Sequence, residues 1–284
     1  MALRIDKGQV AVITGGASGI GYGLAEALAA RGVRLVVADI REDGLAEAQE
    51  SLRAAGAEVT AAATDVSDAA SVRRLADHAV AAYGRVDLVC NNAGVVCPAA
   101  PMWEQDDRTW ERMIGVKLRG VVHGVRAFAP LLIAQGTGHF LNTASAGGLA
   151  PLPGRTPYAG TMHAVVGLTE TLDAELKQVS QALGATVLCP GLVDTPLGEN
   201  SAALGAIRLP PGADSMRSAA AGRDGILTRR EVAEAALAAV AAGRVHTAPG
   251  AGVARRARTR VEGLLADIAA GEGAPPGVHP AGSA

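Results

Sequence analysis

The feature that most restricts the fold is a glycine-rich turn between a short apolar strand and a helix, close to the start of the chain. Residues 9–14 (QVAVIT) form a β-branched run, which is typical of a parallel strand buried on both faces. The turn at residues 15–21 (GGASGIG) follows at once, and residues 22–31 are predicted to be helical. This order of strand, turn and helix indicates the start of a parallel βαβ unit.

The same alternation continues along most of the chain, with short joints that contain glycine. Predicted strands cover residues 9–14, 33–39, 58–64, 86–90, 139–144, 185–189 and 244–249. Predicted helices cover residues 22–31, 41–55, 68–83, 107–135, 158–182, 228–242 and 253–270. We therefore predict an α/β fold with a doubly wound parallel sheet of about seven strands, flanked by helices.

Residues 1–270 are predicted to form one domain, because no internal repeat or second set of elements is visible. Residues 192–225 lose the periodic pattern and are rich in Gly, Pro, Ala and Ser, which indicates a loop that binds substrate. Thr228 and Glu231 are predicted to form a capping box that starts the next helix. The Pro- and Gly-rich residues 271–284 are predicted to be a disordered tail.

Composition limits the kinds of partner. The chain of 284 residues has a formal net charge of −2, which gives no general attraction to nucleic acid or to an anionic membrane. No apolar run approaches the roughly 18 residues of a membrane helix, and the start MALRIDKGQ lacks the apolar stretch of a signal peptide. We expect a cytoplasmic protein that binds a small molecule.

Two clusters are predicted to have no chemistry of their own. The cysteines Cys90, Cys97 and Cys189 are odd in number and lack metal-type spacing, so we expect small hydrophobic side chains and neither a disulfide nor a metal site. Four arginines in the last predicted helix are expected to form a solvated face, since no basic excess supports them elsewhere. They are Arg255, Arg256, Arg258 and Arg260.

A serine and a tyrosine are spaced so that they can share one substrate oxygen. Ser145 follows the predicted strand HFLNTA, and Tyr158 begins an apolar-periodic helix thirteen residues later. A hydroxyl at a strand end and a phenol at a helix start can together bind and deprotonate an alcohol. With this pair and the glycine turn, the sequence resembles the short-chain dehydrogenase/reductase family over about residues 8–250. The resemblance implies a one-domain Rossmann fold, a nicotinamide cofactor and alcohol–ketone chemistry.

The nucleotide site is predicted from the turn and from the end of the second strand. Gly15 allows the sharp turn, Gly19 lets the backbone approach the pyrophosphate, and Gly21 lets the helix pack on the strand. Asp39 can accept hydrogen bonds from the ribose hydroxyls and would repel a 2′-phosphate, and Ser18 is not basic. NAD(H) is therefore expected to bind in preference to NADP(H), although Arg41 lies nearby. The resemblance adds Ile20, Asp65, Val66, Asn92, Ala93, Gly94, Tyr158, Pro190, Gly191, Val193 and Thr195 as cofactor contacts.

The catalytic set departs from the family pattern at two positions. In the family, Tyr is the acid/base, Ser holds the substrate oxygen, a Lys four residues after the Tyr lowers the Tyr pKa, and an Asn anchors a water. Here Met162 stands in place of the Lys, and Lys117 stands in place of the Asn. The Met side chain has neither a charge nor a hydrogen-bond donor. Because Met162 lies one turn after Tyr158, we expect it to face the cofactor. Lys117 either supplies the missing cation or points elsewhere and leaves the enzyme impaired. His163 is expected to serve packing or a subunit contact.

The first hypothesis for the function is an NAD-dependent oxidoreductase for a secondary alcohol or ketone, with Tyr158, Ser145 and Lys117 as catalytic residues. The alternatives are a nucleotide-binding protein without activity and an enzyme with non-redox acid/base chemistry. A hydrophobic or polycyclic substrate is expected from the mostly apolar residues near the site. They are Val95, Val96, Met102, Trp103, Gly147, Leu149, Leu152 and residues 192–225. The resemblance also implies a homo-oligomer, most often a tetramer, paired through the two long helices.

Overall fold

The computed structural model describes residues 3–208 and 225–272, and its centre is a seven-stranded parallel sheet. The strand order is β3-β2-β1-β4-β5-β6-β7, and β1 and β4 are parallel neighbours. Successive strands are added outward from β1 to β3 on one side and from β4 to β7 on the other, so the winding of the chain reverses between β1 and β4. This confirms the predicted doubly wound sheet. The strands are β1 (Val10–Thr14), β2 (Arg34–Asp39), β3 (Val59–Ala63), β4 (Leu88–Asn91), β5 (Gly138–Thr143), β6 (Leu183–Leu188) and β7 (His246–Thr247).

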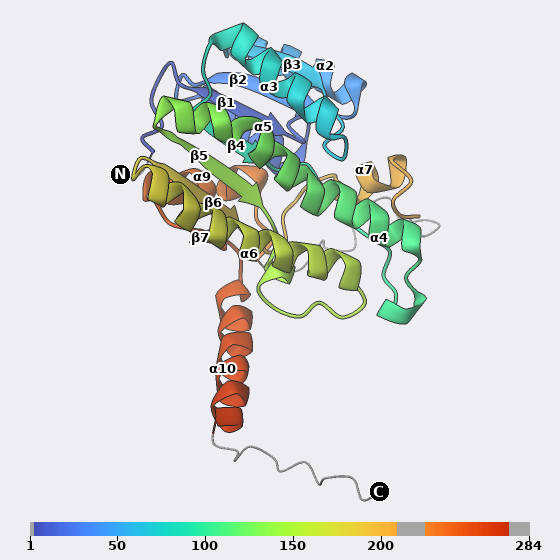
Figure 1. Ribbon diagram of the computed structural model, residues 1–284. Coiled ribbons are helices and arrows are strands. Elements are labelled where there is room, and N and C mark those ends of the chain that lie inside the picture. The colour runs from blue at the N-terminus through green and yellow to red at the C-terminus, as the bar shows by residue number, and fades with distance from the viewer. Residues whose placement is uncertain (1–2, 209–224, 273–284) are drawn as a thin grey trace, which may run out of the picture.

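Helices cover both faces of the sheet (Figure 1). One core cluster packs α1 (Gly19–Ala29), α2 (Glu42–Ala54) and α9 (Arg229–Ala241) against one face. A second cluster packs α3 (Ala69–Tyr83), α5 (Gly120–Gln135) and α6 (Thr156–Val179) against the other face. The described residues also form the helices α4 (Asp107–Met113), α7 (Leu197–Ala203) and α10 (Val253–Glu272). Because the strands are apolar on both faces, packing a helical layer on each face removes apolar surface from water and stabilises the fold.

The helix predicted at residues 107–135 is not a uniform α-helix. It consists of α4, a π-helical turn η2 (Ile114–Arg119) and α5, with Pro130 inside the last part. The π turn inserts an extra residue into the helical repeat and changes the direction in which nearby side chains point. Lys117 lies within this turn, so helical spacing alone could not place its side chain.

The segment predicted as an irregular loop at residues 192–225 is partly helical, because it contains α7. Residues 209–224 of this loop and residues 273–284 of the predicted tail lie outside the described residues. The capping box at the start of α9 is confirmed, since Thr228 Oγ1 accepts from Glu231 N and the Glu231 carboxylate accepts from Thr228 N at 2.8 Å. None of the described helices has the length and apolarity needed to cross a bilayer.

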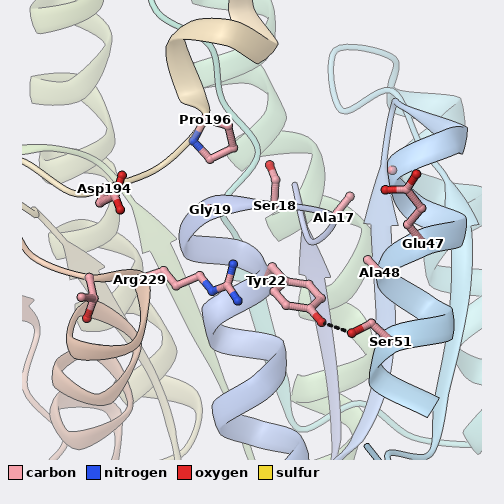
Figure 2. A pocket seen from close by; sticks show the side chains of 12 residues that line it. Ala17, Ser18, Gly19, Tyr22, Glu47, Ala48, Ser51, Asp194, Pro196 and Arg229 are labelled. Carbon is pink, nitrogen blue, oxygen red and sulfur yellow. Dashed lines mark hydrogen bonds between the residues drawn. The ribbon is translucent and has the colours of Figure 1, made fainter. Parts of the chain in front are cut away.

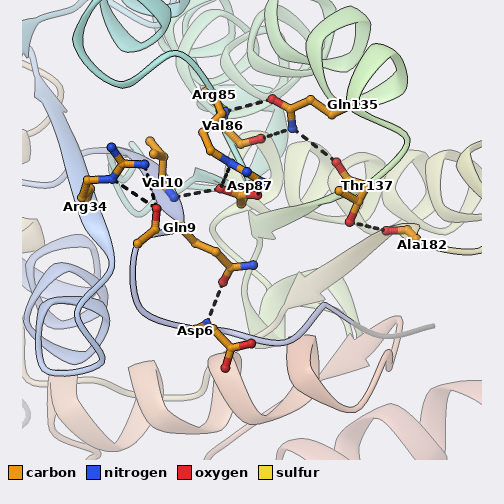
Figure 3. A network of polar contacts seen from close by, with 11 residues as sticks. Asp6, Gln9, Val10, Arg34, Arg85, Val86, Asp87, Gln135, Thr137 and Ala182 are labelled. Atoms are coloured by element: carbon orange, nitrogen blue, oxygen red, sulfur yellow. Dashed lines mark hydrogen bonds and ion pairs between the residues drawn. The ribbon is translucent and has the colours of Figure 1, made fainter.

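A polar network closes the amino edge of the sheet (Figure 3). Asp87 is buried, accepts from Val10 N at 2.9 Å, and accepts two hydrogen bonds from Nε and Nη2 of Arg85. Gln135 at the end of α5 accepts from Val86 N and donates to Val86 O. These contacts tie β1, β4 and α5 together at the edge opposite the predicted site.

Candidate active site

A cavity of about 1110 Å³ lies at the carboxyl edge of the sheet, where parallel strands of such folds bind ligands. It extends from the end of β2 to the start of α6 and brings together the nucleotide residues and the catalytic residues predicted above. Those that line it are Gly15, Ser18, Gly19, Ile20, Asp39, Asp65, Val66, Asn92, Ala93, Gly94, Lys117, Ser145, Tyr158, Pro190, Gly191, Val193 and Thr195. Gly21 does not line it, because this residue is buried against the turn itself.

The glycine turn packs so closely against its neighbours that a side chain at Gly15 or Gly21 would collide with the backbone. Gly15 has a φ of +63°, and a Cβ there would lie 2.8 Å from Ala93 Cα. A Cβ on Gly21 would lie 2.1 Å from Gly15 O, which explains the close packing of α1 on β1. Ser18 precedes α1 without a side-chain cap, so the first N–H groups of the helix remain available to an anion. These features fit the pyrophosphate of a dinucleotide.

The far end of the cavity contains Asp39 and a polar bridge to α7. The Asp39 carboxylate accepts from Ala17 N at 3.2 Å and from Arg41 N at 3.1 Å. Arg41 donates to Asn200 Oδ1 at 3.0 Å, and Asn200 donates to Ser18 Oγ at 3.0 Å. The Arg41 guanidinium is therefore engaged with α7. Asn200 was missed by sequence reasoning, because its partners lie far away in the chain and no local pattern indicates the contact.

Ser145 and Tyr158 meet at the other end of the cavity. Ser145 follows β5, and its Oγ accepts from Gly147 N at 3.2 Å, which holds the hydroxyl in place after the strand end. Tyr158 lies in the first turn of α6. Desolvation raises the pKa of the Tyr158 phenol, and its hydrogen bond with the Ser145 hydroxyl partly offsets the rise. Without a further cation, this phenol would hold its proton more tightly than free tyrosine does.

Lys117 supplies a cation in the same place. Its side chain is 6% exposed, and its Nζ lies 5.9 Å from the centroid of the Tyr158 ring. The side chain runs beside Gly94, where a Cβ would lie 2.5 Å from Nζ. Within residues 3–208 and 225–272, no hydrogen bond or ion pair is found for this ammonium group. Burial lowers the Lys117 pKa from 10.5 to about 8.

The prediction that Met162 faces the cofactor is wrong. Met162 is fully buried and does not line the cavity. Its side chain packs in an apolar cluster with Val121, Val165, Val187 and neighbouring residues between α5, α6 and β6. A flexible thioether without charge is more stable in such a cluster than beside a polar cofactor. His163 is partly buried and contacts Ala159 O of its own helix, so it is not a second base in the cavity.

Only some of the residues predicted to contact substrate line the cavity. Val96 and Leu152 line the cavity, as do several apolar residues of the segment around α7. Met102 and Trp103 do not, because they lie on a short 3-10 turn and are 54% and 85% exposed. The prediction is wrong for these two residues. Val95, Gly147 and Leu149 are also absent from the lining: Val95 and Leu149 pack into apolar clusters beside it, and Gly147 is buried in the turn after Ser145. Sequence reasoning missed Arg155, which lines the cavity and donates to Cys97 O.

A second, smaller hollow of about 520 Å³ lies beside α1, α2 and the start of α9 (Figure 2). Tyr22 donates to Ser51 Oγ at 2.8 Å, and the Arg229 guanidinium lies 4.8 Å from the Tyr22 ring while it pairs with Glu26. These contacts hold the three helices together. Tyr158, Ser145 and Lys117 line the larger cavity and not this hollow.

Comparison with known proteins decides the family. A family model described as short chain dehydrogenase matches residues 9–203. The chain belongs to the short-chain dehydrogenase family. Members of this family share the glycine turn and the Ser–Tyr site that the structure brings together.

Three relatives of the short-chain dehydrogenase family are particularly similar. A 1-deoxy-11-beta-hydroxypentalenate dehydrogenase of Streptomyces avermitilis is 43% identical over 191 residues, which are 66% of this chain and 70% of that protein. The 3beta-hydroxysteroid dehydrogenase 2 of Eggerthella lenta is 35% identical over 192 residues, which are 67% of this chain and 73% of that protein. A crystal structure of a short-chain dehydrogenase/reductase from Burkholderia phymatum in complex with NAD is 37% identical, with a TM-score of 0.85 and coverage of 93% of this chain and 97% of that one.

Membership of the short-chain dehydrogenase family establishes a general chemistry. The chain is an oxidoreductase of the alcohol–ketone type that acts on a small molecule, and the family uses a nicotinamide cofactor. The residues present fit that cofactor, because the glycine turn, the free start of α1 and Asp39 lie along one cavity with Tyr158.

Proposed function

We propose that this protein is an NAD-dependent oxidoreductase that interconverts a secondary alcohol and a ketone on a mostly apolar molecule. The observation that carries the proposal is the buried ammonium of Lys117 beside Tyr158, in the same cavity as Ser145 and the glycine turn. This cation comes from a different helical segment from the lysine of the family pattern, and its position beside Tyr158 supports a relocated catalytic lysine.

Each catalytic side chain then has a defined task. The Ser145 hydroxyl donates a hydrogen bond to the substrate oxygen, and the hydrogen bond that its Oγ accepts from Gly147 N holds it in place. The Tyr158 phenolate takes the hydroxyl proton of the alcohol, or the phenol returns it to the ketone. When bound, the nicotinamide supplies the group that exchanges a hydride with the substrate carbon.

The Lys117 ammonium favours the phenolate form of Tyr158. Its Nζ lies 5.9 Å from the centroid of the Tyr158 ring, and a cation near a phenol stabilises the phenolate and so lowers the phenol pKa. This effect opposes the rise in the Tyr158 pKa that burial causes, so the relocated lysine can take over the role of the one missing at Met162.

The nature of the cofactor and substrate follows from the two ends of the cavity. Asp39 supports NAD(H) over NADP(H), because its carboxylate would repel a 2′-phosphate and the Arg41 guanidinium is engaged by Asn200. Val96, Leu152 and Leu197 give the substrate end an apolar character. The named relatives act on a hydroxypentalenate and a 3β-hydroxysteroid, which supports an apolar polycyclic alcohol as the substrate class.

The decisive experiment is turnover of a panel of hydroxysteroids and hydroxyterpenoids by Lys117→Ala. We expect turnover to fall by about two to four orders of magnitude, the scale of acid/base machinery. The pH at half-maximal oxidation should rise, because loss of a nearby cation raises the Tyr158 pKa further. The control is Lys7→Ala, which removes an exposed lysine from a turn outside the cavity. Unchanged turnover in Lys117→Ala would show that this lysine does not take the catalytic role.

A further inference from the structure

Helix α10 carries an exposed apolar stripe. Val253 anchors its first turn in the body of the molecule and is 3% exposed, whereas the stripe residues Val261, Leu264, Leu265 and Ile268 are 45% to 60% exposed. Figure 1 shows the helix, in red, leaving the body and projecting away from the sheet. The stripe residues follow the spacing i, i+3, i+4, i+7, so they share one face of the helix. Such a face is typical of a helix that packs against another helix.

The charge on α10 is divided along its length. Exposed basic residues come first along the helix, and exposed acidic residues follow them. They are Arg255, Arg256, Arg258 and Arg260, and then Glu262 and Asp267. An anionic membrane or a nucleic acid would attract the first half and repel the second. Two parallel copies of the helix would set like charges against each other, whereas two antiparallel copies set each basic half against an acidic half.

We propose that α10 pairs in an antiparallel arrangement with α10 of a second copy of this chain. A two-fold axis relates the helices, and Val261 of each copy packs against Leu264 of the other. The same register places Ile268 opposite the small Ala257. It also places Arg260 beside Asp267 of the second copy, and the symmetry repeats this pair. The stripe is then self-complementary in both shape and charge.

The pairing concerns a different surface from the α5 and α6 faces that the family resemblance implies. Because α10 has 20 residues and rises about 1.5 Å per residue, it extends about 30 Å and can reach a second copy beyond the body surface. The proposal is also independent of the proposed activity, since no residue of α10 lines the catalytic cavity.

Light scattering of the full chain over a micromolar dilution series tests the contact. Leu264→Asp should halve the mass of the assembly, because it places a carboxylate in the centre of the apolar seam. Ala266→Asp adds the same charge to the opposite face of the same helix and should leave the mass at the wild-type value. Loss of mass in both variants, or in neither, would overturn the proposal.

Charge exchange tests the orientation. Arg260→Asp should weaken association by about tenfold, and the double variant Arg260→Asp/Asp267→Arg should restore it to within about threefold of wild type. Failure of the double variant to recover would overturn the antiparallel register. Sedimentation of the wild-type chain with phosphatidylglycerol vesicles tests the competing occupant. Vesicle binding that Leu264→Asp abolishes, with no change in mass, would overturn self-pairing in favour of a membrane surface.

Discussion

Asp87 and Lys117 are both buried charges, but their surroundings are opposite. Asp87, at the amino edge of the sheet, is 1% exposed and is held by the Arg85 guanidinium and Val10 N (Figure 3). Lys117, at the carboxyl edge, is 6% exposed and lacks an ion pair or hydrogen bond in the part of the chain that the structure describes. An unpaired buried charge is costly, so its retention indicates a use. The amino edge is built for stability, and the carboxyl edge keeps a charge available for chemistry.

The strongest test of this contrast moves the cation back to the family position. Lys117→Asn alone should lower turnover by about two to four orders of magnitude, and adding Met162→Lys should not recover the loss, because residue 162 packs in the apolar cluster between α5, α6 and β6 and does not line the cavity. Met162→Lys alone should give no gain in turnover, because it places an ammonium group in that apolar cluster and not beside Tyr158. Steady-state turnover of all three variants is the measurement. A gain of tenfold or more in Met162→Lys alone would instead indicate a wild-type site that has lost activity.

The two buried charges should also respond oppositely to neutralisation. Asp87→Asn should lower the free energy of unfolding by about 1–3 kcal/mol, because it weakens the hydrogen bonds that a buried carboxylate accepts from Arg85 and from Val10 N. Lys117→Met should raise it by about 1–3 kcal/mol at pH 7, because it removes an unpaired buried charge. Urea unfolding of the protein without ligand measures both changes. A destabilised Lys117→Met would show that the ammonium has a structural partner after all.

The pH dependence of stability should report the Lys117 ammonium directly. Its pKa is about 8 in the folded protein and 10.5 when free, so the folded state releases this proton first as the pH rises. Folding is therefore penalised in full below pH 8, and the penalty disappears between pH 8 and 10.5. The relief amounts to about 3 kcal/mol. The free energy of unfolding of the wild type minus that of Lys117→Met, measured by urea unfolding at each pH, should rise by this amount between pH 8 and 10.5. A difference that does not change with pH would contradict the prediction.

Asp39 is intermediate between Asp87 and Lys117. Its carboxylate is partly exposed, accepts hydrogen bonds from two backbone N–H groups and lines the cavity, where a ligand can reach it. Asp39→Ala should shift the ratio of NADP(H) to NAD(H) affinity by about tenfold toward NADP(H), because the repulsion of a 2′-phosphate is lost. Fluorescence titration of both cofactors measures the shift. Asp43→Ala, an exposed neighbour outside the cavity, is the matched control. Equal affinity of the wild type for both cofactors would contradict the proposed preference.

Local patterns in the sequence determined the fold and most of the candidate site. The glycine turn, the β-branched strands and the capping box at Thr228 each depend on neighbouring residues, so short windows were sufficient to predict them. Parallel strands bring their carboxyl ends to one edge, and this rule alone predicts that Asp39, Ser145 and Tyr158 share a cavity.

The direction of individual side chains was decided only by the tertiary structure. A π turn directs Lys117 beside Tyr158, a cluster of three elements draws Met162 away from the cavity, and Asn200 reaches Arg41 across the fold. None of these contacts lies within one helical turn in the sequence, so the 3.6-residue period could not reveal them. The sequence alone determined which residues stand near the site. Packing between distant elements decided which of them face it, because each side chain takes the direction that its neighbours leave open.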